Sequence, residues 1–328
     1  MSTVTSLGDD FKLFCGRANP DLGEEIAEIL SVSLGKIRIS TFADSEVHVQ
    51  IEESIRGKDI YIVQSTCEPV NENLMELLVM LDAFRRASAR QITAIVPYYG
   101  YARQDHKSTG REPISAKLVA DLITAAGADR VVSVDLHATQ IQGFFNIPMD
   151  HLTAVPILAS YFKENKLQDA VIVSPDVGRA KLADKYTDIL HLPMVLMNKR
   201  RSGVGGKKVE FLEIVGDVEG KTPILIDDVI ASGSIAEQAD ELVKAGSKEV
   251  CLAITHPVLV GPALERLQSA AVKELIVTNT IPVPEEKRLD GKVKVLSIAP
   301  LLAKAIQRIH QNLSVSQVFI EENILFAV

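Results

Sequence analysis

Short apolar runs alternate along the chain with segments of helical periodicity, and this alternation restricts the fold more than any other feature. Because the runs are apolar at every position instead of every second one, they predict strands buried on both faces of a parallel sheet. Strands alternating with helices indicate an α/β fold. The predicted strands span 59–64, 91–96, 131–135, 170–174, 192–197, 222–227, 249–255 and 274–278.

Helices are expected between these runs. Apolar residues recur at helical spacing from Leu74 to Phe84. A second helix is predicted over 113–126, with Pro113 in its first turn, and a third over 232–245, starting at Ser232. A further amphipathic pattern over 299–312 predicts a helix whose packing partner the sequence leaves open.

The chain also shows a weak internal repeat. Segments 120–137 and 239–256 align without gaps and share Gly127/Gly246 and His137/His256. A common helix–glycine–strand pattern explains such a match, and so do two domains of one topology joined near 148–156. We favour the second explanation, two domains of one topology.

Composition excludes some classes of function. The chain has 328 residues and a formal net charge of −8, which disfavours general nucleic-acid binding. No apolar run reaches the roughly 18–20 residues that span a bilayer, and the first residues lack a signal-peptide pattern, so we expect a cytoplasmic protein without a membrane partner. Cys15, Cys67 and Cys251 are too far apart for a zinc pattern and are expected to be reduced thiols.

Polar and glycine residues collect where the predicted strands end, which is where open α/β sheets bind ligands. One strand ends in Asp227 and Asp228, and the small residues Ala231, Ser232, Gly233, Ser234 and Ile235 follow it into a helix. Backbone amides at a helix N-terminus favour an anion. Paired carboxylates suit sugar hydroxyls or a metal. A solvated turn is the alternative, but the pattern favours a phosphosugar site.

The sequence DDVIASGSI (227–235) resembles the phosphoribosyl-binding loop of type I phosphoribosyltransferases and of ribose-phosphate pyrophosphokinases. The block 64–105 is similar to the pyrophosphokinases, as are FADSEV (42–47), VSPDVG (173–178) and NKRR (198–201). The resemblance extends over about 11–320.

This resemblance implies Mg²⁺-dependent transfer of the diphosphoryl group of ATP to ribose 5-phosphate, giving 5-phosphoribosyl 1-pyrophosphate and AMP. It also implies two phosphoribosyltransferase-like domains of mostly parallel sheet flanked by helices, and a homo-oligomer, either a dimer or a hexamer. The implied division is an N-terminal pyrophosphokinase domain over 8–150, a C-terminal phosphoribosyltransferase-like domain over 151–320, and a tail over 321–328.

The resemblance also assigns roles to individual residues. The implied ATP-binding residues are Phe42, Asp44, Glu46, Arg103, Gln104 and His106. Lys199, Arg201 and His137 are the implied catalytic residues, and His137 and Asp176 the implied metal ligands. The implied ribose 5-phosphate site comprises Asp227, Asp228, Ala231, Ser232, Gly233, Ser234 and Ile235. The segment Lys107–Glu112 is expected to form a lid.

Four departures from the family pattern surround the expected site. Ala231 and Ile235 replace an acidic and a hydroxyl residue in the phosphosugar loop, and Arg179 stands where a second glycine is usual. Asn198 replaces an aspartate and His106 an arginine. These changes leave a second hypothesis open, a catalytically weak homologue that assembles with or regulates an active enzyme. A phosphoribosyltransferase is disfavoured, because it has no need of the ATP-binding segments.

Overall fold

The computed structural model describes residues 7–202 and 209–320, except for the side chains of 199–202, 209–212, 269, 319 and 320. The chain divides into two compact units. The first contains the residues up to Thr153, the short segment Thr280–Pro282 and the segment from Ser297 onward, and the second contains Ala154–Asn279 and Val283–Leu296. The predicted α/β architecture of two domains is confirmed, and the tail 321–328 lies outside the described residues.

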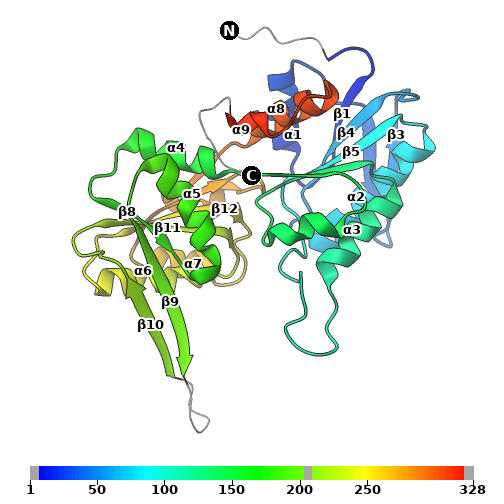
Figure 1. Ribbon diagram of the computed structural model, residues 1–328. Coiled ribbons are helices and arrows are strands. Elements are labelled where there is room, and N and C mark those ends of the chain that lie inside the picture. The colour runs from blue at the N-terminus through cyan, green and yellow to red at the C-terminus, as the bar shows by residue number, and fades with distance from the viewer. Residues whose placement is uncertain (1–6, 203–208, 321–328) are drawn as a thin grey trace. The chain divides into compact units, whose positions relative to one another are not determined.

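The first unit is built on a five-stranded parallel sheet (Figure 1). Its continuously apolar strands are buried on both faces, as the sequence predicts. In spatial order the strands are β1 (Phe11–Cys15), β4 (Asp59–Val63), β5 (Gln91–Val96), β6 (Arg130–Val134) and β7 (Met149–Leu152).

Helices cover both faces of this sheet. Phe14 of β1 packs on Phe84 at a ring-centroid distance of 4.6 Å, so α2 (Val70–Arg86) lies on one face, together with α3 (Ser115–Ala126). Phe11, three residues earlier in the same strand, faces the opposite side. There its ring lies 5.2 Å from that of His310 in α8 (Ala299–His310), which packs against α1 (Pro20–Leu30).

The segment from Ser297 onward therefore belongs to the first unit, although the sequence-based division placed it in the C-terminal domain. Ser297 is hydrogen-bonded to Glu25 of α1, and Nε2 of His310 lies 2.7 Å from the carbonyl oxygen of Leu7. The sequence showed an apolar stripe on α8 but not which sheet would cover it. The first unit also contains the hairpin β2 (Ile37–Thr41) and β3 (Val47–Ile51), the 3-10 helix η1 (Thr139–Phe144) and the short helix α9 (Gln317–Ile320).

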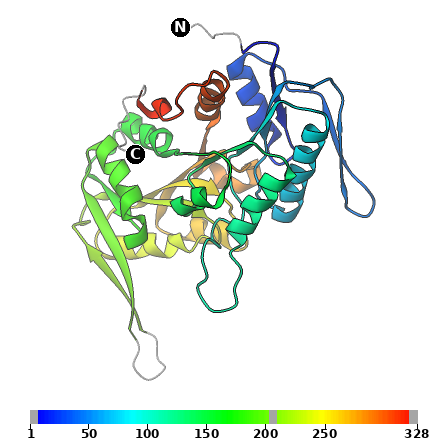
Figure 2. The same ribbon diagram turned by 45° about the vertical axis from the view of Figure 1, so that its right-hand side comes forward.

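The second unit contains a seven-stranded sheet (Figure 2). All its neighbouring strands are parallel except the antiparallel pair at one edge, β10 (Val209–Val215) and β9 (Met194–Ser202). The order continues with β8 (Ala170–Ser174), β11 (Thr222–Ile230), β12 (Val250–Pro257), β13 (Val272–Thr278) and β14 (Val293–Leu296). Its helices are α4 (Val155–Asn165), α5 (Ala180–Leu190), α6 (Ile235–Lys244) and α7 (Ala263–Ser269), with 3-10 turns η2 (Val177–Arg179), η3 (Glu285–Lys287) and η4 (Leu289–Gly291).

The winding of this sheet reverses between β8 and β11. From β8 the chain proceeds to β9 on one side, and from β11 it proceeds to β12 on the other. Ligands in open α/β sheets bind outside the carboxyl ends of the strands at such a switch point. We therefore expect the ligand site of the second unit at the residues that follow β8 and at the end of β11.

Three boundaries differ from the sequence-based prediction. The helix α3 begins at Ser115, two residues after Pro113, and α6 begins at Ile235, three residues after Ser232. The strand β9 continues to Ser202, so NKRRS belongs to the strand and not to a loop after it. The extension of β9 follows from its antiparallel pairing with β10, which reaches Ser202.

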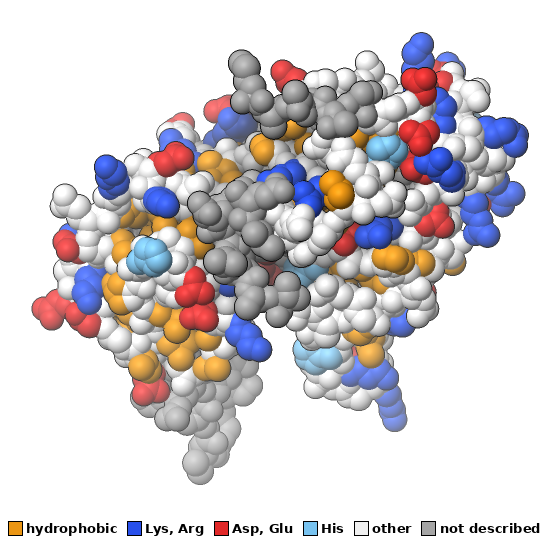
Figure 3. All heavy atoms as spheres, turned by 45° about the horizontal axis from the view of Figure 1, so that its top comes forward, with side chains coloured by type: hydrophobic (Ala, Val, Ile, Leu, Met, Phe, Trp, Pro, Cys, Tyr) orange, Lys and Arg blue, Asp and Glu red, His pale blue; other side chains and the backbone are white. Residues whose placement is uncertain are grey.

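The surface fits the mixed composition of the chain. Acidic and basic side chains are interspersed on the face shown in Figure 3. No helix among residues 7–202 and 209–320 is long and apolar enough to cross a membrane.

Candidate active site

An arginine and two aspartates meet at the switch point of the second unit. Nε of Arg179 lies 2.9 Å from Oδ1 of Asp227, and Nη2 lies 2.6 Å from Oδ1 of Asp228. Arg179 ends the 3-10 turn that follows β8, while both aspartates lie near the carboxyl end of β11. The strand continues to Ile230, beyond its predicted end at 227, so both acids are held by the sheet instead of a loop.

The acidic pair has an unusual electrostatic environment. Burial raises the pKa of Asp227 well above the usual carboxyl range, and the hydrogen bond and negative charge of Asp228 raise it further. The guanidinium of Arg179 acts in the opposite direction. The single positive charge of Arg179 therefore offsets part of the negative charge of Asp227 and Asp228.

The loop between β11 and α6 presents backbone amides. Gly233 has a φ of +76°, a left-handed conformation that favours glycine, and Nη1 of Arg266 donates to the carbonyl oxygen of Ser232 at 3.2 Å. The side chains of Ser232 and Ser234 are exposed, and no side chain within the described range caps the N-terminus of α6. A helix N-terminus with uncapped amides is suited to a phosphate group.

Ile235 takes a different place from the one its predicted role implies. Its side chain is only 8% exposed and packs in the core of the second unit with Leu242 of the same helix. Its backbone amide lies in the first turn of α6, but the side chain is directed into the core. Ala231 is half-buried, and its carbonyl oxygen accepts from the amide of Val260 at 3.0 Å.

Asp176, the predicted metal-linked acid, is exposed at the start of the turn after β8. Its Oδ1 accepts from the amide of Arg179 at 3.0 Å, and its carbonyl oxygen accepts from Oγ of Ser174 at 2.8 Å. The side chain thus acts as a cap and also fixes the backbone from which Arg179 projects.

Lys199 and Arg201 lie on β9, where their backbones pair in register with Leu212 and Glu210 of β10. The side chains of these predicted catalytic residues lie outside the described residues.

In the first unit, the predicted adenine-contacting residues lie in the turn of the β2–β3 hairpin. Asp44 and Glu46 are exposed, and Oδ1 of Asp44 accepts from the amide of Glu46 at 3.3 Å. Phe42 is 53% exposed, and its ring lies 5.2 Å from that of His48. A large aromatic face left in solvent is suited to stacking on a flat ligand.

The other predicted ATP-binding residues, Arg103, Gln104 and His106, are exposed on the loop between β5 and α3. The buried carboxylate between them, Asp105, organises this loop: Oδ1 lies 2.7 Å from Nδ1 of His106, and Oδ2 accepts from Nε2 of Gln140 at 2.6 Å. Burial acts to raise the pKa of Asp105, but the hydrogen bond to His106 and the other bonds outweigh it, so the pKa lies below the ordinary value.

His137, the predicted residue at the metal–phosphate centre, follows β6 three residues before Gln140 and is half-buried. The Gln140–Asp105 bond therefore brings the segment of His137 beside the loop that carries His106. On its other side, the amide of Leu136 donates to Nε2 of His151 at 2.9 Å, which anchors the backbone next to His137.

The predicted lid, Lys107–Glu112, is held by one of its own residues. The carboxylate of Glu112 accepts from the amides of Ser108 and Thr109 and from the Thr109 hydroxyl. These hydrogen bonds, first among them the one from Thr109, lower the pKa of Glu112. The segment forms a self-contained turn of polar residues.

One polar cluster of the first unit was not predicted. Glu76 is buried in α2, where its carboxylate binds the backbone amide and Nε of Arg17 at 2.6 Å each and accepts from Gln64 at 3.1 Å. Arg17 lies two residues after the end of β1, and Gln64 directly follows β4. The signal was available: Glu76 lies between Leu74 and Leu77, inside an apolar stripe.

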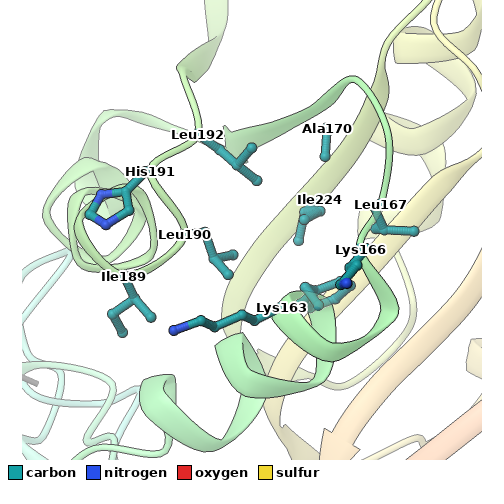
Figure 4. A pocket seen from close by; sticks show the side chains of 10 residues that line it. Lys163, Lys166, Leu167, Ala170, Ile189, Leu190, His191, Leu192 and Ile224 are labelled. Atoms are coloured by element: carbon teal, nitrogen blue, oxygen red, sulfur yellow. The ribbon is translucent and has the colours of Figure 1, made fainter. Parts of the chain in front are cut away.

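Two cavities in the described part of the chain lie away from all of these residues. One, of about 230 Å³, lies between α4 and α5, with Lys163, Lys166 and His191 around an apolar floor (Figure 4). It includes Ala170 and Ile224, so it lies at the amino ends of β8 and β11. The other, of about 300 Å³, lies beside Phe11 and Lys58 at the amino end of the first sheet.

The structure thus brings the predicted residues together in two sets. In the second unit, Asp176, Asp227 and Asp228 surround Arg179, next to the loop 231–235. In the first unit, the segments of His106 and His137 are joined through Asp105 and Gln140.

Comparisons with known proteins identify relatives of this arrangement. A model of the N-terminal domain of ribose phosphate pyrophosphokinase matches residues 11–127, and a model of the phosphoribosyl synthetase-associated domain matches 198–320. The ribose-phosphate pyrophosphokinase of Clostridium acetobutylicum is 51% identical over 96% of this chain and 99% of its own length. That of Bacillus subtilis is 54% identical over 94% of this chain and 97% of its own length. The crystal structure of phosphoribosylpyrophosphate synthetase from Mycobacterium smegmatis superposes with a TM-score of 0.86 and 48% identity, covering 92% of this chain and 99% of that one.

Proposed function

Because the chain belongs to the ribose-phosphate pyrophosphokinase family, we propose that it transfers the diphosphoryl group of ATP to ribose 5-phosphate with Mg²⁺ as its cofactor. The chain is an enzyme that forms 5-phosphoribosyl 1-pyrophosphate, and the sequence-based prediction of this reaction is confirmed. We propose in addition the identity of the nucleotide donor, the metal, and the roles of individual residues.

The observation that carries the proposal is the acidic pair followed by a helix-opening loop at the switch point of the second sheet. Carboxylates on β11 accept hydrogen bonds from ribose hydroxyls, and the amides of Ser232, Gly233, Ser234 and Ile235 receive the 5-phosphate. Ala231 connects the two parts. This arrangement fixes a sugar phosphate at both of its polar ends.

The nucleotide belongs to the first unit under this proposal. Phe42 stacks on the adenine, with Asp44 and Glu46 as polar partners, and Arg103, Gln104 and His106 contact the nucleotide. An exposed guanidinium suits phosphate, because it donates two parallel hydrogen bonds. The Asp105–Gln140 bond supports this role by fixing the loop that carries these groups.

The residues present fit the proposed metal. Mg²⁺ usually keeps several waters and binds one or two protein groups plus substrate phosphates, so it needs no cluster of three protein ligands. No such cluster occurs among the residues described. Asp176 offers an exposed carboxylate and His137 a half-buried imidazole as candidate ligands. When bound, Mg²⁺ would neutralise phosphate charge.

The chemical step follows from the two substrates. The anomeric hydroxyl oxygen of ribose 5-phosphate attacks the β-phosphorus of ATP, a bond forms between them, and the bond from the β-phosphorus to the oxygen that stays on AMP breaks. The hydroxyl proton is released to water, and AMP leaves with the bridging oxygen. We propose that Lys199 and Arg201 stabilise the charge of the migrating group, since fixed cations are the main device for phosphoryl transfer.

We further propose a cytoplasmic homo-oligomer, at least a dimer. The three cysteines, all in the described part of the chain, form no disulfide, which fits a reducing compartment. Light scattering at micromolar concentration tests the assembly, and a monomer alone would contradict it.

Purified protein supplied with ATP, ribose 5-phosphate and Mg²⁺ should release AMP and 5-phosphoribosyl 1-pyrophosphate in equal amounts. The matched control is Lys199→Ala, which should reduce turnover strongly while leaving the fold intact. AMP formation no greater than that of the variant would overturn the proposal and favour a regulatory homologue.

A further inference from the structure

Arg179 contacts both members of the acidic pair with different nitrogens of one guanidinium. Nε meets Oδ1 of Asp227 at 2.9 Å and Nη2 meets Oδ1 of Asp228 at 2.6 Å. The arginine side chain is 19% exposed, and that of Asp228 is 5% exposed. These contacts are therefore shielded from solvent, where ion pairs are worth more than at a surface.

The backbone holds the arginine in this place. Its amide donates to Oδ1 of Asp176 at 3.0 Å, and Ser174, the last residue of β8, binds the carbonyl oxygen of Asp176 at 2.8 Å. Arg179 also directly precedes α5. The guanidinium thus projects from a short turn that is fixed at both ends, which reduces the entropy lost in pairing.

The same oxygen of Asp227 that meets the arginine also accepts from the amide of Asp228 at 2.8 Å. Both interactions therefore fix the orientation of the Asp227 carboxylate about Oδ1. Without a cation, two adjacent carboxylates that are largely shielded from solvent repel one another and favour taking up a proton.

We propose that Arg179 is a positioning residue of the sugar subsite, holding the carboxylates of Asp227 and Asp228 ionised and oriented to accept the hydroxyl groups of ribose 5-phosphate. This inference rests on the proposed function, since it concerns the sugar of that reaction. The family resemblance implies a glycine at this position, and this chain has Arg179 there instead.

Other charged groups lie on the elements around the pair. The bridging contacts assign the role to Arg179, because it is the cation that meets both carboxylates in the described structure. Charged or titratable groups on the neighbouring elements include Asp176 before η2, Lys181, Asp184, Lys185 and Asp188 of α5, Glu237, Asp240, Glu241 and Lys244 of α6, His256 of β12, and Glu265 and Arg266 of α7.

Arg179→Ala should raise the KM for ribose 5-phosphate by about tenfold to a hundredfold, the effect of losing one charge-assisted contact. The kcat and the KM for ATP should change less than threefold, because the hydroxyls that the pair binds do not react. Arg179→Lys should restore part of the affinity for ribose 5-phosphate, since lysine keeps the positive charge but lacks the planar guanidinium that contacts both carboxylates. Lys181→Ala removes an exposed cation of the same region and should leave all three constants unchanged.

Calorimetric titration with ribose 5-phosphate separates this inference from the proposed function, because sugar binding is measured even if no product forms. The Kd should rise in parallel with the KM in the alanine variant. If that variant fails to fold, as judged by circular dichroism, the lysine variant still tests the inference through its intermediate KM. An unchanged or lower sugar KM in a folded variant, or an equal rise in the KM for ATP, would overturn it.

Discussion

Gly233 is the position in the phosphosugar loop where a single added methyl group should do most damage. Its φ is +76°, and a Cβ built on it would lie 2.9 Å from Cα and 3.0 Å from the carbonyl oxygen of Ala263. Ala263 is fully buried at the start of α7, so its backbone cannot move aside without disturbing the core. Gly233→Ala must therefore shift the loop itself.

The magnitude follows from two separate costs. A left-handed conformation costs a non-glycine residue roughly 1–2 kcal/mol. Forcing an extra methyl group into a packed region adds about 1–3 kcal/mol. Gly220 provides a matched control, because its φ is +67° but nothing lies within 4 Å of an added Cβ. Gly220→Ala should thus lose only about 1–2 kcal/mol of unfolding free energy, and Gly233→Ala roughly 2–5 kcal/mol.

Urea unfolding of the two variants measures this difference directly, and steady-state kinetics measure its consequence. A displaced loop moves the amides away from the 5-phosphate, so Gly233→Ala should also raise the KM for ribose 5-phosphate by about tenfold or more. Gly220→Ala should leave the KM unchanged. Equal stabilities of the two variants would refute the steric reasoning, and a normal KM in Gly233→Ala would refute the role of the loop.

Three further outcomes are expected. Ile235→Thr should lower the free energy of unfolding, measured in urea, by about 1–2 kcal/mol, because it removes buried apolar atoms. The KM for ribose 5-phosphate should stay unchanged. A lower KM would show that the side chain of residue 235 contacts the phosphate. Burial and Asp228 raise the pKa of Asp227. The kcat/KM for ribose 5-phosphate should therefore fall as the pH drops through a value well above the ordinary carboxyl pKa of about 4. A fall in kcat/KM only near pH 4 would contradict the raised pKa. Burial raises the pKa of Cys15 and of Cys251 to about 12, so only about one thiol in ten thousand is ionised at pH 8; both should resist alkylation in the native protein, and rapid labelling by iodoacetamide would count against their burial.

The strands were the most predictable part of the fold. The run 170–174 coincides with β8, and 91–96 coincides with β5. A strand buried on both faces has a continuous apolar sequence whose ends are set by polar residues, so its limits can be read locally. The repeat was also structural: Gly127 and Gly246 follow α3 and α6 with positive φ, and each precedes a core strand.

Elements that depend on distant partners were less predictable. The helix α8 has a clear apolar stripe, but its burial against α1 depends on residues nearly the whole chain away. The start of α6 was predicted three residues too early, because Ser232 is a common capping residue but here lies in the loop before the helix.

In the candidate site, too, local features were predictable from the sequence and features that depend on distant partners were not. Motif spacing identified the acidic pair and the loop after it. It assigned Ile235 to the ligand because of its position, yet the first turn of a helix has an inner and an outer side, and this apolar side chain packs inside. The buried network of Glu76 was missed because its partners Arg17 and Gln64 come from different strands.

With its departures from the family pattern, the sugar-phosphate site has two parts that should respond differently to amino-acid substitution. Under the proposed function, and with the side chain of Ile235 in the core, the 5-phosphate is recognised by backbone amides, which most side-chain substitutions leave in place. Under the same proposal, the sugar ring is recognised by the carboxylates of Asp227 and Asp228, both of which Arg179 contacts. A substitution therefore weakens phosphate binding only if it moves the backbone, as at Gly233, whereas the ring subsite responds to the loss of one guanidinium.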